Sequence, residues 1–314
     1  MTSPVAPWRI PPKVLGVSAA VAVVLLVPLV AGYLWAGVPA AIGIGMGYIA
    51  ALRAGLTLRP PQALALVVPA AMAGAVAVAL RGQPLAAAFF VALCCLLVAP
   101  ANALVDSLMA GLPSAVALLV SVPGDLEVAP TAGWMVVGGV VVVALGSRLR
   151  DPAASRQGVP QAIAWRHAVV TAVAVGVVVY GVALLAWPHG YWVALTLTVV
   201  LRPYGEETRR RSGQRVIGTV AGALVSLLIA TLLPLGLIVV ALAACVVLTL
   251  AYTVLRDDTG QAVFMTPAVV LLGSAGSTGV LAAERVAYTV TGAAAAVVIA
   301  IALNWLDGRR EVAS

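Results

Sequence analysis

Residues 14–36 read VLGVSAAVAVVLLVPLVAGYLWA, and residues 167–187 read HAVVTAVAVGVVVYGVALLAW. Neither stretch contains Asp, Glu, Lys or Arg, and each is long enough to cross the roughly 30 Å hydrocarbon core of a bilayer as a helix. They begin two groups of six apolar stretches that resemble each other at an offset of about 150 residues. The remaining stretches cover residues 38–52, 60–80, 84–101, 108–122 and 129–147, then 189–201, 215–232, 234–255, 261–277 and 284–304.

The composition agrees with a membrane protein. Hydrophobic residues make up 63% of the chain and charged residues only 9%, and the mean hydropathy is +1.11. A soluble globule of 314 residues would need more polar surface than this. The sequence therefore predicts an all-α, polytopic membrane protein with about 12 transmembrane helices, for which the lipid bilayer is the solvent.

The two groups predict two parallel six-helix repeats. Pro113 aligns with Pro267, and Gly138 with Gly292, both at an offset of 154 residues. Because six is an even number, both groups enter the membrane in the same direction, which places the symmetry axis along the membrane normal and a transport pathway between the repeats. Chance similarity between Ala- and Val-rich helices is the alternative.

This division gives the expected domains. Residues 1–147 form the first membrane repeat, residues 148–166 a cytoplasmic linker, and residues 167–314 the second repeat with a short cytoplasmic tail.

Basic residues predict the orientation, because cytoplasmic loops retain Lys and Arg. With the N-terminus inside, only Arg81 and Arg285 of the 18 basic residues fall outside. We therefore expect a multi-pass protein of the cell inner (plasma) membrane with both termini cytoplasmic. The basic pI, about 9.8, is explained by anchoring against anionic lipid, so no nucleic acid partner is expected.

Residues 191–222 form the most patterned segment, YWVALTLTVVLRPYGEETRRRSGQRVIGTVAG. An aromatic pair opens a short apolar stretch, Pro203 lies at its cytoplasmic end, and a basic loop leads to Arg-x-x-Gly-Thr-x-x-Gly, here beginning at Arg215. This segment resembles the signature of the fusaric acid resistance protein-like (FUSC) family of membrane transporters. The resemblance covers the second half well and the first half only faintly.

The resemblance implies a twelve-span efflux-type carrier for aromatic carboxylates or related anions, with a more distant likeness to plant malate channels. Many bacterial members carry large soluble domains after each membrane half. Here the 148–166 segment and the tail after Trp305 are too short for such domains, so substrate and partners do not transfer directly.

The candidate pathway residues are mostly hydroxyls and charges in or beside this segment. Guanidinium groups pair well with carboxylates and stay charged, so arginines flanking one tight loop could gather organic anions at a cytoplasmic mouth. Two aspartates, one in each repeat, are kept because they correspond at an offset of 152 residues. The set is Tyr191, Trp192, Thr196, Thr198, Arg202, Pro203, Tyr204, Arg215, Thr219, Asp106 and Asp258.

Each of these residues also has a structural interpretation. The arginines could be topology anchors, each threonine could bond the backbone carbonyl one turn earlier, and the aspartates could be solvated groups near helix N-termini. Small residues at four-residue spacing, Gly218 with Gly222 and Ala70 with Gly74, are typical of close helix packing in membranes.

Other chemistries find little support. The only lysine is Lys13, which rules out a P-loop and ATP hydrolysis by this chain. The cysteines have no metal-ligand spacing, and no carboxylate or histidine lies deep in an apolar stretch for a proton relay. We expect neither cofactor nor metal, and no enzymatic activity.

The leading prediction is an exporter of a small organic anion. A passive anion channel, an intramembrane enzyme acting on a lipid-linked substrate, and a non-transporting envelope scaffold remain alternatives. Substrate, direction, coupling ion and oligomeric state are left open by the sequence.

Overall fold

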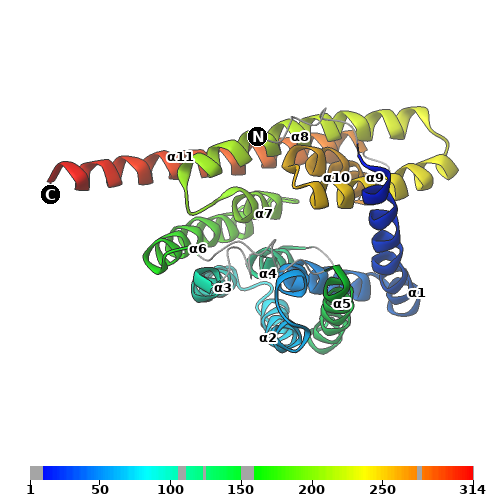
Figure 1. Cartoon of the computed structure of the whole chain (residues 1–314), viewed down its shortest axis with the longest axis horizontal. Helices are drawn as coiled ribbons and strands as arrows, with labels where there is room; N and C mark the ends of the chain where they lie inside the picture. The colour runs from blue at the N-terminus through cyan, green and yellow to red at the C-terminus, as the bar shows by residue number, and fades with distance from the viewer. Residues whose placement is uncertain (1–9, 105–110, 123–124, 150–158, 274–277, 314) are drawn as a thin grey trace. The chain divides into compact units, whose positions relative to one another are not determined.

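The computed structural model describes residues 10–104, 111–122, 125–149, 159–273 and 278–313. Within these ranges the chain forms eleven helices and no strands (Figure 1). The helices are α1 (Pro12–Thr57), α2 (Pro60–Ala79), α3 (Pro84–Leu104), α4 (Gly111–Ser121), α5 (Val128–Leu149), α6 (Gln161–Leu184), α7 (Tyr191–Val200), α8 (Gly205–Leu232), α9 (Leu235–Leu255), α10 (Asp258–Gly273) and α11 (Thr278–Ala313).

Eight of the described helices are long and apolar enough to cross a membrane: α1, α2, α3, α5, α6, α8, α9 and α11. Their outward faces carry large apolar side chains; Val173, Val177 and Leu184 on α6, for example, are all exposed. Such surfaces are stable only when lipid covers them. The prediction of an all-helical, multi-pass membrane protein is confirmed.

Proline and glycine set several of the expected boundaries. Proline at the first helical position needs no backbone hydrogen bond, and Pro12, Pro60 and Pro84 begin α1, α2 and α3. Gly37 has φ of 73° inside α1, so this element consists of two helical segments joined at a kink. The kink lies between the expected stretches 14–36 and 38–52.

Two expected stretches differ from the observed helices. α8 begins at Gly205, ten residues before the predicted start, because Glu206 and Glu207 occupy its first turn and suit the positive end of the helix dipole. The stretch predicted over residues 108–122 is only the 11-residue α4 within the described part of the chain. α4 and the 10-residue α7 are each about 15–17 Å long, roughly half the hydrocarbon thickness.

The Cα positions divide into two compact units. One contains Met1–Val24 and Gly213–Val290, and the other contains Leu25–Ser212 and Thr291–Ser314. We call them the smaller and the larger unit. The boundaries cut across the expected halves, since α6 and α7 pack with α2 to α5 in the larger unit. The two-repeat arrangement therefore stays a prediction.

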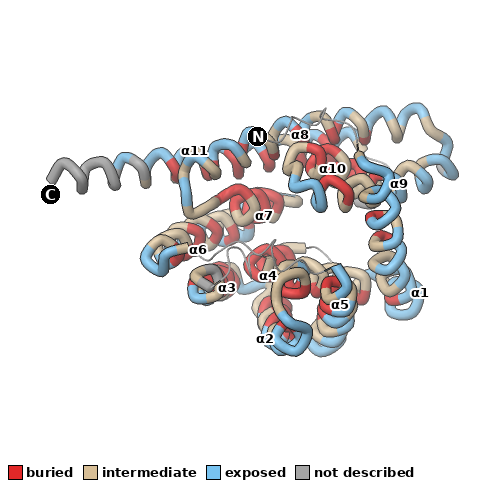
Figure 2. Tube along the Cα trace, viewed as in Figure 1, coloured by how far each residue is buried: buried red, intermediate tan, exposed pale blue. Residues whose placement is uncertain are grey.

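In the larger unit, two short helices occupy the core. α4 contacts α2, α3, α6 and α7, while the longer helices form the pairs α2 with α5 and α3 with α6 (Figure 1). Figure 2 shows α4 and α7 as buried along most of their length. In α4 every residue from Leu112 to Leu119 is buried, and in α7 every residue from Trp192 to Leu197. These helices are surrounded by protein rather than lipid, which is how incomplete spans are tolerated at membrane depth.

In the smaller unit, α10 packs against both α9 and α8. The rings of Tyr252 and Phe264 stack between α9 and α10, with centroids 5.5 Å apart. Arg256 follows the last residue of α9 and has a left-handed φ of 57°, which reverses the chain into α10. Asp257 then accepts hydrogen bonds from the backbone N–H groups of Thr259 and Gly260, both 3.0 Å long, which caps the first turn of α10.

Candidate functional site

The α7 helix begins with the predicted aromatic pair. Gly190 precedes it and lies so close to α6 that an added Cβ would be 2.8 Å from the side chain of Val182. The rings of Tyr191 and Trp192 lie with centroids 4.9 Å apart, and Trp192 is buried. At the start of α7, Trp192 therefore packs inside the larger unit, whereas Tyr191 is partly exposed.

The two threonines of α7 contact different helices. A Cβ added at Gly292 of α11 would lie 2.8 Å from Cβ of Thr196, so Thr196 is buried where α11 crosses α7. Thr198 is half-buried and meets Ser114 of α4, with 2.7 Å between the hydroxyl oxygens. Since the Thr198 hydroxyl also donates to the carbonyl of Leu195 at 2.9 Å, Ser114 donates its proton to Thr198. The sequence did not predict Ser114, because only the fold brings α4 to α7.

The turn between α7 and α8 is held by one buried side chain. Thr208 accepts a hydrogen bond from the backbone N–H of Arg202 at 2.9 Å, and its hydroxyl lies 3.3 Å from the carbonyl oxygens of Arg202 and Tyr204. Thr208 is 1% exposed. It fixes the path of Arg202, Pro203 and Tyr204, of which Tyr204 is exposed and the other two are half-buried.

The basic segment that follows is helical rather than a loop. Arg211 and Glu207 form an ion pair with 3.1 Å between Nε and Oε1, one turn apart on α8. Arg209 and Arg210 are exposed. These side chains give the N-terminal part of α8 a solvated, positively charged surface.

Arg215 differs from the other arginines of this segment. It lies almost three turns into α8 and is only 6% exposed, whereas the sequence placed it beside a tight loop. Its guanidinium lies 3.9 Å from the sulfur of Met265 on α10. It also interacts electrostatically with the carboxylate of Asp258, the first residue of α10. Within the smaller unit, the fold thus brings together two residues that were predicted separately.

Thr219 lies one turn beyond Arg215 and is 1% exposed. Within the described part of the chain, no hydrogen-bond partner is found for the Thr219 hydroxyl or for Nε of Arg215. Buried polar groups are rarely left in this state unless water or a ligand reaches them. The pair is therefore the strongest candidate for a binding group in the smaller unit.

The predicted packing glycines face neighbouring helices. A Cβ at Gly218 would lie 2.6 Å from the carbonyl oxygen of Thr259, and one at Gly222 would lie 2.7 Å from Cβ of Thr266, both on α10. In the larger unit, Ala70 and Gly74 are buried on α2, and a Cβ at Gly74 would overlap the sulfur of Met135 on α5. Close helix contact at the three glycines is thus consistent with their small size, and Ala70 is buried one turn before Gly74.

Asp106 lies outside the described residues. Among the residues that are described, no group of three or more His, Cys, Asp or Glu side chains is arranged to hold a metal ion.

A protein-family model described as fusaric acid resistance protein-like matches residues 173–299. This part of the chain is similar to the fusaric acid resistance protein-like family. The match includes α7, α8 and α10, and hence Thr198, Arg215 and Asp258. The resemblance inferred from the 191–222 segment is confirmed over the matched range.

No curated protein and no solved structure matches the chain. The fusaric acid resistance protein-like family and the many apolar helices together indicate a role in membrane transport.

Proposed function

We propose that the protein exports small organic anions across the cell inner membrane, with aromatic carboxylates as the first substrates to test. The observation that carries this proposal is the burial of Arg215 in an apolar helix, next to the unsatisfied hydroxyl of Thr219. Ionisable groups at membrane depth are costly and usually serve a function. A guanidinium offers a fork of donors that matches a carboxylate.

Asp258 gives the guanidinium of Arg215 an internal counter-ion. A substrate carboxylate that reaches Arg215 would compete with Asp258 for it. When no substrate is bound, Asp258 compensates the buried charge of Arg215, which lowers the free-energy cost of burying it. Asp258 is also the carboxylate to replace when testing whether anion movement is coupled to protons.

The proposed pathway lies between two parallel six-helix repeats, residues 1–147 and 167–314. Two equivalent contacts support the repeats. A Cβ at Gly138 of α5 would collide with the carbonyl of Ile44 in the second predicted stretch, and one at Gly292 of α11 would lie 3.0 Å from the carbonyl of Val193 in the eighth. In each repeat the last helix therefore crosses the second at a glycine.

The contact between α4 and α7 supports the location of the pathway. α4 belongs to the first predicted repeat and α7 to the second, and both are too short to span the bilayer alone. α4 is the fifth stretch of its repeat and α7 the second, so the two are not repeat equivalents. Short or interrupted helices where two repeats meet are nevertheless typical of substrate sites in transporters. The Ser114–Thr198 hydroxyl pair would supply hydrogen bonds along such a route.

The test is flux through the purified protein in proteoliposomes, with fusarate, benzoate and malate as candidate substrates. We expect carboxylate flux that is lost in Arg215→Gln and reduced in Thr198→Val but kept in Thr198→Ser. Thr231→Val is the matched control, because the Thr231 hydroxyl also bonds a carbonyl one turn earlier but faces outward. Flux of none of these acids, or normal flux in Arg215→Gln, would show the proposal to be wrong.

The same vesicles separate a carrier from a channel. A proton-coupled carrier responds to an imposed pH gradient at zero membrane potential, and Asp258→Asn should abolish that response. A passive anion channel follows the potential alone, and its flux should be unaffected by the gradient. The orientation, with both termini cytoplasmic, is supported by the distribution of the basic residues.

A further inference from the structure

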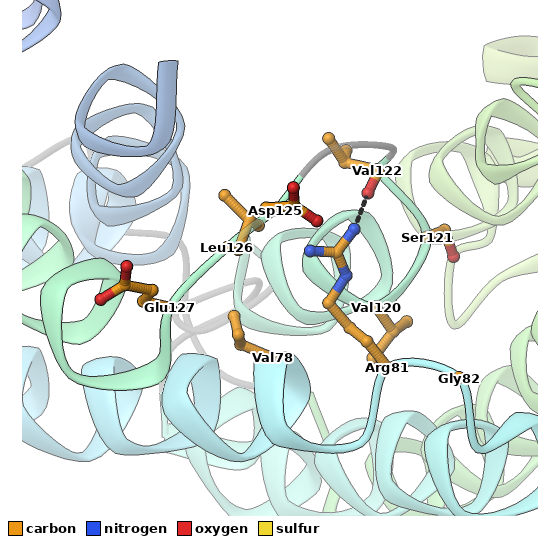
Figure 3. Close-up of a pocket in the computed structure, with 9 residues that line it drawn as sticks. All are labelled: Val78, Arg81, Gly82, Val120, Ser121, Val122, Asp125, Leu126 and Glu127. Carbon is orange, nitrogen blue, oxygen red and sulfur yellow. Dashed lines mark hydrogen bonds between the residues drawn. The ribbon is translucent and has the colours of Figure 1, made fainter. Parts of the chain in front are cut away.

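A pocket of about 510 Å³ lies at the C-terminal end of α4 in the larger unit (Figure 3). Its volume is in the range of small-molecule sites. The walls come from the end of α2, the turn into α3, the end of α4 and the segment before α5. The apolar lining residues are Val78, Val120, Val122 and Leu126, and the charged ones are Arg81, Asp125 and Glu127.

The turn between α2 and α3 positions Arg81. Its backbone N–H donates to the carbonyl of Val78 at 3.2 Å, and Gly82 adopts φ of 78°, a left-handed conformation that reverses the chain. Figure 3 shows the Arg81 side chain extending from this turn toward Val122 and Asp125. Its guanidinium donates a hydrogen bond to the carbonyl of Val122.

Capping of α4 does not use all of the hydrogen-bond donors of Arg81. Val122 follows the last residue of α4, and its carbonyl is one of those that a helix leaves without a partner. The guanidinium has five N–H donors, and its bond to the carbonyl of Val122 uses one of them. The remaining donors lie in a pocket whose lining is mixed, with charged side chains beside the apolar ones. Such a lining can contact both the carboxylate and the hydrocarbon part of an organic acid.

We propose that this pocket binds the carboxylate of an organic anion through Arg81, with the valine and leucine side chains holding the hydrocarbon part. The inference rests on the proposed function in one respect: the ligand is of the same class as the transported substrate. In the predicted topology the α2–α3 turn is on the outer side of the membrane, so the pocket is a release site.

Asp125 and Glu127 make this site weak for an anion. Both are exposed carboxylates at the rim, and Figure 3 shows Asp125 nearer the guanidinium than Glu127. With Arg81 they give the pocket a formal charge of −1. Like charges next to a bound carboxylate lower its affinity, which favours departure of the exported anion rather than its recapture.

The test measures binding to the full chain in lipid nanodiscs, without transport. The probes are 2-naphthoate and 2-naphthylmethylammonium, which share a ring system and differ in the sign of their charge. We expect added naphthoate, but not the ammonium compound, to displace bound naphthoate. This displacement should require Arg81. Arg81→Gln should weaken naphthoate binding roughly tenfold or more, as loss of a charge-assisted hydrogen bond does, and Arg81→Lys should recover part of the loss.

A second variant keeps Arg81 and its bond to Val122. The double substitution Asp125→Asn with Glu127→Gln should tighten naphthoate binding by about two- to fivefold, since each removed charge is exposed and its repulsion is screened. Arg148→Gln and Glu206→Gln, both exposed on other helices, are matched controls and should leave the affinity unchanged.

The outcomes separate this site from the proposed function. The pocket proposal would be overturned if the protein binds the ammonium probe more tightly than naphthoate. It would also be overturned if neither Arg81→Gln nor the double substitution changes the naphthoate affinity, even if carboxylate flux is observed. Arg81-dependent naphthoate binding in a protein that moves no carboxylate would support the pocket and refute the transport function.

Discussion

Adding one methyl group at Gly218 should destabilise the protein, whereas the same addition at Gly213 should not. Both glycines lie on α8, but a Cβ at Gly213 would meet nothing within 4 Å. At Gly218 it would lie 2.6 Å from the carbonyl oxygen of Thr259 and from Cβ of Ala262. Ordinary contact begins at 3.4 Å, so α10 must move away by about 0.8 Å.

The expected change in the free energy of unfolding follows from two opposing contributions. Replacing glycine by alanine in a helix favours folding by about 1 kcal/mol, and this term is common to Gly213→Ala and Gly218→Ala. Overpacking a tight contact costs about 1–3 kcal/mol, and this term applies only at Gly218. The Gly218→Ala protein should therefore be about 1–3 kcal/mol less stable than the Gly213→Ala protein.

The assay is equilibrium unfolding in mixed micelles, followed by circular dichroism and by protection of an engineered cysteine on α10. Comparing two alanine variants of one helix removes the difference in helix propensity. Equal stability of the two variants would refute the close α8–α10 contact. A Gly218→Ala protein that is less stable yet keeps its α10 protection would place the strain elsewhere.

Three further results are expected. A cysteine at Gln83 should react with an impermeant reagent from outside intact cells, and one at Arg210 should not, in a background without native cysteines; the reverse pattern would invert the topology. Loss of transport in Arg215→Gln should be nearly independent of salt between about 0.05 and 0.5 M, because buried charges are poorly screened; the smaller loss in Arg210→Gln should disappear at high salt, and equal salt dependence would contradict the burial. Thr208→Val should cost about 1–3 kcal/mol of unfolding free energy, since it leaves the Arg202 N–H unpaired, whereas Thr208→Ser should be nearly neutral; an unchanged Thr208→Val protein would show that this bond does not hold the turn.

The sequence predicts helix positions well where local chemistry sets the boundary. Pro60 and Pro84 begin helices as expected, and Gly37 interrupts α1, because a missing N–H or a left-handed φ acts within one turn. The predicted start of α8 was ten residues too late, because its charged first residues were expected to form a loop. Charged residues are common in loops. Here Glu207 and Arg211 pair one turn apart and extend the helix.

The candidate site was predicted less completely, since its contacts join distant parts of the chain. Ser114 is a single hydroxyl in an apolar stretch, and its partner Thr198 lies 84 residues away. The burial of Arg215 likewise depends on α10, which begins more than forty residues later. Sequence periodicity identifies which residues share a helix face, but not which helix covers that face.

Helix packing and the buried charge in the smaller unit depend on the same contact. The buried stripe of α8 contains Arg215, Gly218, Thr219, Gly222 and Ser226, whereas its lipid-facing side is apolar. Lipid provides no hydrophobic force between helices, so small residues let backbones approach and gain dispersion energy. At Gly218 this approach reaches the carbonyl of Thr259, the neighbour of Asp258. Close packing at one glycine therefore brings the start of α10, which carries Asp258, beside the turn of α8 that carries Arg215.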